Sequence, residues 1–338
     1  MNFSSDTAAP VHPAILQALA EANAGPAPSY GADKWTAAAK AALSEAFETE
    51  LDMWLVPSGT AANALCLALI CPSHGAIACH EEAHIERDER GAPEFFTGGA
   101  KLALLPGAHA KIDLAALKAR LDASRPAFVH EVPVCALSLS NLTESGASYT
   151  ASEIAERTGL ARAHGYVHLD GARFANALVT TGATPAELSW KAGVNLMSFG
   201  ATKNGAIGCE AILLFGEARK FAPDLMARAK RAGHMPPKMR FLGAQMAAYL
   251  KDGLWLDLAR RSNASAKRLA DSLVKAGGKL AHPVDGNEVF CHLPDGAADR
   301  LGAAGASFYP WPDGSHRFVC SWATTDAEID AAVRTIGA

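Results

Sequence analysis

The sequence predicts an α/β fold with a largely parallel sheet, followed by a smaller α+β domain. Short apolar runs rich in Val, Ile, Leu and Phe alternate with amphipathic stretches through the first two thirds of the chain, and long helical stretches follow. Strands that alternate with helices pair in parallel and are covered on both faces. In such folds ligands collect at the carboxyl ends of the strands, so the motifs that directly follow strands are the first candidates for a site.

The expected strands of the large domain are apolar runs that end at Gly, Pro or a helical stretch. In chain order they are Met53–Val56, Ala76–Cys79, Leu102–Leu105, Ala127–Val132, Tyr166–Leu169, Leu196–Phe199 and Ala211–Phe215. Among the stretches between them, Ile112–Leu121 and Ser152–His164 show the spacing of amphipathic helices, and Thr150 is a plausible N-cap for the second.

In the last third of the chain long helical stretches replace the alternation of strands and helices. Helices are expected at Glu217–Ala232, at Phe241–Lys251 and at Leu254–Ala276, the last with a bend near Arg261. Short strands around Asn287–Leu293 and His316–Trp322 and a final helix at Asp326–Ile336 complete the chain. We therefore divide the chain into an N-terminal arm (1–30), a large domain (31–240) and a C-terminal part (241–338) with long helices and a small α+β domain. The arm would wrap over the body or over a partner subunit.

Composition narrows the class of protein. With 338 residues, 49% of them hydrophobic, the chain can bury a sizeable core. A formal net charge of −4 and scattered Lys and Arg argue against nucleic acid as a partner and favour a small substrate. No basic leader with an apolar continuation and no stretch long enough to cross a bilayer are present, so we expect a cytoplasmic protein. The seven cysteines include no C-x-x-C pair, which favours reduced, buried thiols.

Lys203 carries the strongest local signal. It lies in S-F-G-A-T-K-N-G, just beyond the expected strand Leu196–Phe199, among small and hydroxyl-bearing residues. A lysine pressed against the end of a sheet is desolvated, which lowers its pKa and favours the neutral, nucleophilic amine. Taken alone, the motif is equally compatible with a solvated lysine before a Gly turn.

Asp170 and the turn at Ser58 supply two further pieces. In Y-V-H-L-D-G-A-R an apolar strand delivers the Asp170 carboxylate to its own end, where it could pair with a protonated pyridine nitrogen or simply cap a helix. In V-P-S-G-T-A-A-N the residues Ser58, Gly59 and Thr60 stand where a strand passes into a helix, and a helix start can hold a phosphate monoester. The pairing of Asp170 with Lys203, one strand and helix apart, is far more specific than either residue alone.

Taken together, S-F-G-A-T-K-N-G, H-L-D-G-A-R, S-G-T-A-A-N and an N-terminal S-S-D-T resemble the low-specificity L-threonine aldolases. The order and spacing agree from about Ser4 to Ala323. The resemblance implies an aspartate-aminotransferase-like large domain, the fold type I of pyridoxal 5'-phosphate (PLP) enzymes. It also implies an amino-acid substrate and a homodimer or homotetramer with active sites shared between subunits.

The resemblance also assigns roles to residues of this chain. Lys203 would form the Schiff base with PLP, Asp170 would pair with the pyridinium, Ser58, Gly59 and Thr60 would hold the phosphate, and His84 would stack on the ring. Arg173, Ser5 and Arg317 would orient the substrate carboxylate, because a guanidinium fork suits two carboxylate oxygens. Arg240 resembles an arginine that reaches the phosphate from a neighbouring subunit.

The implied reaction is retro-aldol cleavage of L-threonine, L-allo-threonine or a related β-hydroxy-α-amino acid, such as phenylserine, to glycine and an aldehyde. A PLP-dependent β-eliminating lyase or an amino-acid racemase would use the same residues to break a different bond. A zinc hydrolase is a third reading, because C-H-E-E-A-H contains H-E-x-x-H, with His80 and His84 as ligands and Glu81 as base.

The group that accepts the β-hydroxyl proton is left open by the sequence. Many aldolases of this family carry a histidine in a Glu-Asn-Thr-His stretch, whereas this chain reads S-L-S-N-L-T-E-S from Ser138 to Ser145. His84, directly or through a water, is the first candidate for the base. His130, on the expected strand Ala127–Val132, is the second.

Overall fold

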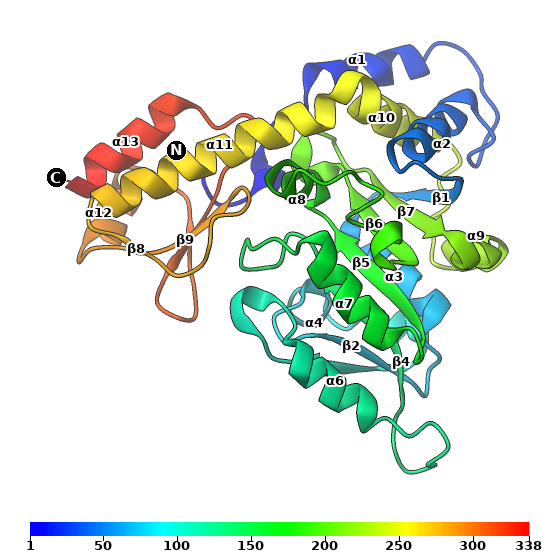
Figure 1. Ribbon diagram of the computed structural model, residues 1–338. Coiled ribbons are helices and arrows are strands. Elements are labelled where there is room, and N and C mark those ends of the chain that lie inside the picture. Colours follow the sequence, from blue (N-terminus) through cyan, green and yellow to red (C-terminus); the bar gives the residue numbers. More distant parts are fainter. Residues whose placement is uncertain (338) are drawn as a thin grey trace.

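The computed structural model describes residues 1–337 and places them in two packed bodies joined by one long helix (Figure 1). Residue 338, the last of the predicted C-terminal part, lies outside the described residues. The larger body contains a seven-stranded sheet in the order β1-β7-β6-β5-β4-β2-β3. Its strands are β1 (Leu51–Val56), β2 (Ala76–His80), β3 (Lys101–Leu105), β4 (Val134–Ser140), β5 (Tyr166–Gly171), β6 (Leu196–Gly200) and β7 (Glu210–Phe215).

Only β7 runs against its neighbours in this sheet. It pairs antiparallel with β1 and with β6, while β6, β5, β4, β2 and β3 pair in parallel. The carboxyl ends of β4, β5 and β6 therefore meet at one edge, because parallel neighbours end on the same side. This mixed, mostly parallel sheet confirms the predicted fold class.

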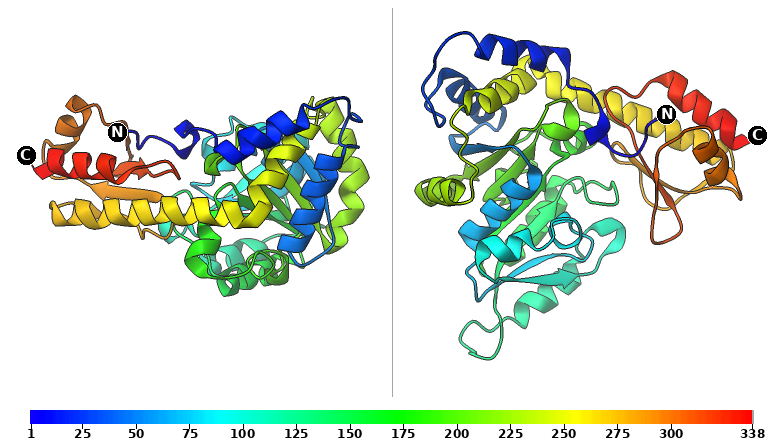
Figure 2. Two further views of the ribbon diagram at one scale, coloured as in Figure 1. Left: turned by 90° about the horizontal axis from the view of Figure 1, so that it is seen from above. Right: turned by 180° about the vertical axis from the view of Figure 1, so that it is seen from behind.

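Helices cover both faces of the sheet (Figures 1 and 2). Residues of α2, α6, α7, α8 and α10 share one hydrophobic cluster with the strands, and residues of α3 and α9 share the other. The bounds are α2 (Lys34–Ala46), α3 (Gly59–Ile70), α6 (Leu114–Asp122), α7 (Ala151–Ala161), α8 (Phe174–Thr181), α9 (Ala222–Arg231) and α10 (Arg240–Leu250). Thr150 caps α7 as predicted, and it forms a full capping box with Glu153.

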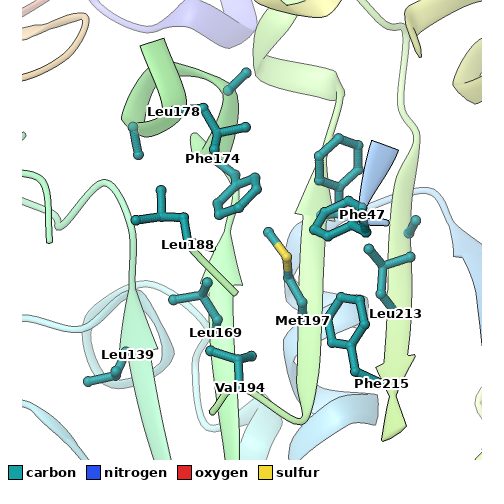
Figure 3. Packing of buried hydrophobic residues seen from close by; sticks show 14 of the residues in the cluster. Phe47, Leu139, Leu169, Phe174, Leu178, Leu188, Val194, Met197, Leu213 and Phe215 are labelled. Carbon is teal, nitrogen blue, oxygen red and sulfur yellow. The ribbon is translucent and has the colours of Figure 1, made fainter. Parts of the chain in front are cut away.

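Aromatic packing fixes α2 and α8 on the first face. Phe47, which directly follows α2, is fully buried and lies 5.9 Å, centroid to centroid, from the stacked ring of Phe174. Figure 3 shows it beside Met197, Leu213 and Phe215, which project from the strands below. Because each buried aromatic ring removes a large apolar area from water, this contact fixes where the ends of β5 and β6 lie.

The smaller body holds an antiparallel sheet in the order β10-β11-β9-β8. Its strands are β8 (Lys279–Leu280), β9 (Glu288–His292), β10 (Tyr309–Pro310) and β11 (His316–Val319), and α12 (Ala297–Ala303) and α13 (Asp326–Gly337) pack with them. The connecting helix α11 (Leu254–Lys275) runs the full length between the bodies. The exact boundaries between domains stay a prediction.

The N-terminal segment packs against both bodies of the same chain. Phe3 is fully buried in the core of the smaller body, and its backbone bonds to Ser307 and Val319. The following helix α1 (Pro13–Ala22) lies against α10. Between these two anchors the chain passes the end of β6, where His12 N–H donates to Gly205 O at 2.9 Å.

One predicted strand was wrong. Residues 127–132 form turns with exposed side chains, and Val129 is 88% exposed. The strand begins only after Pro133, because proline cannot donate to a ladder hydrogen bond. The true strand β4 contains serines, and their burial is satisfied by side-chain bonds: Ser138 Oγ lies 3.0 Å from His168 Nδ1. Among the described residues, no helix is long and apolar enough to cross a membrane.

Candidate active site

A cavity of about 270 Å³ lies at the carboxyl ends of the parallel strands. Its walls come from the turn after β1, the ends of β4 and β5, the segment after β6, and Thr7 of the N-terminal arm. Seven of the residues predicted for the site line this cavity: Ser58, Gly59, Thr60, His84, Asp170, Arg173 and Lys203. A larger hollow of about 730 Å³ between α1, α2 and α10 is lined by none of them.

Asp170 lies near the end of β5 and is 7% exposed. Its Oδ2 accepts from Asn63 Nδ2 at 2.7 Å and its Oδ1 from the Ala172 N–H at 2.9 Å. Burial acts to raise the pKa of this carboxyl, but the charge of His84 and the Ala172 N–H outweigh it and hold the pKa below its usual value. Asp170 is thus an ionised acid within the protein, the partner that a pyridinium needs.

Lys203 follows β6 in a short 3-10 turn, η4 (Thr202–Asn204). Hydrogen bonds to α10 and α11 fix this turn, because Asn204 Nδ2 donates to Tyr249 Oη and to Trp255 O, both at 2.8 Å. Gly205 then adopts a φ of +110°, which favours glycine and ends the turn. This local structure presents Lys203 to the cavity while its neighbour Asn204 stays buried.

Glu210, at the start of β7, lines the same part of the cavity. Burial raises its pKa to about 7, against the bond from Thr202 and the charge of Lys203. This carboxyl was not predicted as a site residue, because Glu210 precedes an apolar run and looks like an ordinary residue at the start of a strand.

The start of α3 forms the anion-binding wall of the cavity. Ser58 caps the helix, with its Oγ accepting from the Ala61 N–H at 3.3 Å, and Gly59 and Thr60 begin the first turn. A side chain added at Gly59 would meet no atom within 4 Å, so the approach to the backbone N–H groups is open. Free N–H groups and the positive end of a twelve-residue helix suit a phosphate monoester.

His84 begins the short helix α4 (His84–Arg87) and is held by two carboxylates. Its backbone N–H donates to Glu144 Oε1 at 2.8 Å, and its Nδ1 lies 2.7 Å from Glu89 Oε1. Burial acts to lower the pKa of the imidazole, but the bond to Glu89 and the charge of Asp170 raise it overall. Asn63 links the two acids, because its Nδ2 donates to both Glu89 and Asp170.

The zinc-hydrolase alternative, which rested on H-E-x-x-H, is not supported by this geometry. His80 ends β2 and bonds Gly107 O through Nε2 at 3.1 Å, whereas His84 begins α4 and pairs with Glu89. The two imidazoles therefore do not lie one turn apart on a single helix, as that motif requires. The candidate base Glu81 is exposed. The zinc-hydrolase hypothesis was wrong because H-E-x-x-H requires one continuous helix, whereas here a strand ends at His80 and a helix begins at His84.

Of the residues predicted to bind the substrate carboxylate, Arg173 alone lines the cavity. Its Nε and Nη2 donate to Asp6 at 2.8 and 3.1 Å, and its Nη1 lies 3.3 Å from Glu288 Oε2. Arg317, on β11, donates through Nε and Nη2 to Glu288 Oε1 at 3.1 and 2.7 Å. Glu288, whose side chain is fully buried, thus joins the two arginines.

Two predicted residues lie outside the cavity wall. Ser5 caps the turn η1 (Asp6–Ala8) and bonds Thr7, and it is Thr7 that reaches the cavity. Arg240, at the start of α10, donates to Gly25 O at 3.3 Å, and its Nε is buried without a partner. Its contact with a neighbouring subunit's phosphate stays a prediction.

Several residues of the site were not predicted from the sequence, and one was misplaced. Asn63 lies in S-G-T-A-A-N and had no expected role, and Glu144 lies in the stretch that lacks the histidine of many aldolases. Glu89 follows His84 by five positions and gave no separate signal. His130 lies on an exposed turn, not on a strand, so its candidacy as the base was wrong.

The chemistry of this wall fits PLP. An ionised buried carboxylate, a lysine, an imidazole and an open helix start match the pyridine nitrogen, the aldehyde, the ring face and the phosphate of that cofactor. Each of the four groups faces the same cavity, which is the property that the separate motifs could not establish.

Comparison with known proteins agrees with this interpretation. The family model for the beta-eliminating lyases matches residues 2–295. The low specificity L-threonine aldolase of Pseudomonas aeruginosa is 40% identical over 99% of this chain and 96% of its own, and that of a Pseudomonas species is 38% identical over 99% and 97%.

Solved structures extend the likeness to the whole fold. The Leishmania major threonine aldolase superposes with a TM-score of 0.92 at 29% identity, covering 99% of this chain and 98% of that one. A probable N-succinyldiaminopimelate aminotransferase from Thermus thermophilus, at 20% identity and a TM-score of 0.72, shares the fold. The chain therefore belongs to the beta-eliminating lyase family of PLP-dependent enzymes, within which it groups with the low-specificity L-threonine aldolases.

Proposed function

We propose that this protein is a PLP-dependent L-threonine aldolase that cleaves L-threonine, L-allo-threonine or a related β-hydroxy-α-amino acid to glycine and an aldehyde. The observation that carries the proposal is the single cavity that Asp170, Lys203, His84 and the start of α3 share. Full-length likeness to two low specificity L-threonine aldolases supports the same reaction. Phenylserine fits the same chemistry, because it too carries a β-hydroxyl group.

Each wall residue has one task toward the cofactor. Ser58, Gly59 and Thr60 would hold the phosphate, His84 would lie on the ring face, and Lys203 would hold the aldehyde carbon through its amine. When bound in this way, PLP supplies an electron sink for the bond that breaks at Cα. Asp170 maintains that sink, because an ionised acid keeps the pyridine nitrogen protonated.

Substrate orientation falls to Arg173 and Arg317. A guanidinium fork would fix the substrate carboxylate in one orientation, and that orientation would select which bond at Cα the cofactor's electron sink can act on. In the protein alone both arginines bond Glu288 or Asp6, so the substrate carboxylate would have to share or replace these partners. We further propose a homodimer or homotetramer in which Arg240 reaches the phosphate of a neighbouring subunit.

Product analysis tests this function. The purified protein with PLP is incubated with L-threonine and, separately, with a β-phenylserine, and glycine, aldehyde, ammonia and keto acid are all measured. The proposal predicts glycine with acetaldehyde or benzaldehyde in equal amounts. Ammonia with a keto acid would identify a β-eliminating lyase, and inversion at Cα without cleavage would identify a racemase.

A further inference from the structure

The segment after β4 brings the Glu144 carboxylate, which also holds the His84 N–H, into the cavity. Glu144 lies in a tight turn that is fixed at several points. Thr143 Oγ1 donates to His109 O at 2.9 Å, and the Gly146 N–H donates to Thr143 O at 2.9 Å. Gly146 has a φ of +76°, which favours glycine, so the turn is specified by the sequence. Glu144 is therefore held by a defined loop and not by a mobile one.

The two carboxylate oxygens of Glu144 differ in their hydrogen bonding. Oε1 accepts from Ser140 Oγ at 2.7 Å and from the His84 N–H at 2.8 Å, and these two bonds orient the carboxyl group. Oε2 is buried and has no hydrogen-bond partner. A buried oxygen without a partner is costly, so such atoms mark sites where a further donor is expected. The cavity that contains Asp170 and Lys203 is also the one that Glu144 lines.

The ionisation of Glu144 suits proton transfer near neutral pH. Burial raises its pKa to about 7, against the bonds from Ser140 and the His84 N–H, and the charge of Asp170 raises it further. A general base works best when its pKa lies near the operating pH.

His84, the first candidate from the sequence, is less available as a proton acceptor in this setting. Its Nδ1 is bonded to Glu89, and its pKa is raised, so its proton is retained at a higher pH than that of an ordinary histidine. A residue that stacks on the ring also has its face committed to the cofactor. The imidazole is better suited to holding the ring than to removing a proton.

We infer that Glu144 is the group that accepts the β-hydroxyl proton of the substrate. This inference rests on the proposed aldolase function and completes it. The O–H bond breaks and the proton passes to Glu144 Oε2, while the electron pair of that bond forms the C=O bond of the aldehyde. The Cα–Cβ bond would break with its electron pair drawn into the electron sink that PLP would supply. Water gives Cα the proton that completes glycine, and Glu144 returns its own proton to water after the aldehyde leaves, so the protons balance.

The test is a comparison of Glu144→Gln with a matched control, Glu81→Gln, in the holoenzyme. Glutamine keeps an oxygen that can accept from Ser140 and the His84 N–H, so the turn is preserved while the base is lost. Glu81 is exposed and lies outside the cavity wall. Loss of a general base lowers rates by about 100-fold to 10,000-fold, so kcat for L-threonine should fall by at least about 100-fold in Glu144→Gln and stay unchanged in Glu81→Gln.

Two further measurements distinguish a proton-accepting role of Glu144 from a purely structural one. In the wild type, kcat should rise with pH along an acid limb near pH 7, because the base must be deprotonated, and Glu144→Gln should lack this limb. Glycine, which has no β-hydroxyl, should bind both proteins with the same dissociation constant in a titration of the cofactor absorbance. A tenfold weaker binding of glycine to Glu144→Gln would overturn the inference by showing a structural role.

The outcomes distinguish this inference from the proposed function. A wild type that cleaves no β-hydroxy amino acid defeats both, whereas a wild type that cleaves L-threonine beside a Glu144→Gln variant of equal kcat defeats the base alone. If Glu144→Gln does not fold, Glu144→Asp decides: the inference predicts reduced kcat with the acid limb retained, and wild-type kcat with a shifted or absent limb contradicts it. Infrared titration of the holoenzyme provides a readout without turnover. Glu144 and Glu210 both contribute to the protonated carboxyl absorbance that titrates near pH 7, and Glu144→Gln should lose the Glu144 component while Glu81→Gln keeps it.

Discussion

Replacing Arg317 by alanine should change substrate affinity and protein stability by separate amounts that the structure allows us to estimate. Arg317 gives Glu288 two donated bonds, at 3.1 and 2.7 Å, and the Glu288 side chain is fully buried. Breaking a buried ion pair costs about 3 to 5 kcal/mol. Because Glu288 keeps Arg173 Nη1 at 3.3 Å, we expect a smaller loss, about 2 kcal/mol, in the free energy of unfolding.

The effect on the substrate is estimated independently. Losing a bidentate carboxylate contact removes about 2 to 4 kcal/mol of binding, and at about 1.4 kcal/mol per factor of ten this raises KM for L-threonine by about 30-fold to 700-fold. Steady-state kinetics gives KM, and urea unfolding followed by circular dichroism gives the stability.

A double variant separates the two effects. Adding Glu288→Gln to Arg317→Ala removes the buried carboxylate that has lost its two bonds from Arg317, while Arg173 keeps its two bonds to Asp6. Stability should therefore return to within about 1 kcal/mol of the wild type, while KM stays high. A KM for Arg317→Ala within twofold of the wild type would refute the assignment of Arg317 to the substrate carboxylate. A double variant that recovers KM would show that Arg317 acts only by neutralising Glu288.

Three other predictions concern the cavity wall. Lys203→Ala should abolish turnover with circular dichroism and unfolding midpoint preserved, because Lys203 supplies the amine and no core volume; turnover that survives in an assay of glycine release would contradict its role. Asp170→Asn should retain some PLP by absorbance yet lose most of kcat, because an amide cannot hold the pyridinium charge; near-wild-type kcat would make Asp170 a structural residue. Glu210→Gln should flatten the pH dependence of stability: the folded pKa of Glu210, about 7, exceeds its ordinary value of 4.5, so its contribution is present below pH 4.5 and is lost as the pH rises through 7. The loss is up to about 3 kcal/mol, and urea unfolding at pH 5 and pH 8 measures it; an equal pH dependence in wild type and variant would contradict the burial of an ionisable Glu210.

The sequence predicts the fold well because apolar runs and turns carry the strand order. Six of the strands expected in the large domain coincide with strands of the sheet. The run Ala127–Val132 failed because its residue types suit a strand while Pro126 and Pro133 bracket it. The true strand Val134–Ser140 was hidden by its serines, which are tolerated in the interior because His168 bonds Ser138.

The site was predictable where a residue lies within three positions of the carboxyl end of a strand. Lys203, Asp170 and Ser58 satisfy that condition, so their motifs located them. Glu89, Glu144 and Glu210 do not, and their importance comes from burial and from partners distant in sequence, such as the bond between the His84 N–H and Glu144. The arrangement of Arg173 and Arg317 around Glu288 depends on how the smaller body docks, which local patterns do not encode.

The most direct test of the account asks which lysine holds the cofactor. The PLP-loaded protein is treated with borohydride, which fixes the cofactor permanently to the amine that holds it, and is then digested and mapped by mass spectrometry. We expect the pyridoxyl mass on the peptide that contains Lys203, and no label in Lys203→Ala. A label on any other lysine in the wild type would contradict the assignment of this cavity as the active site.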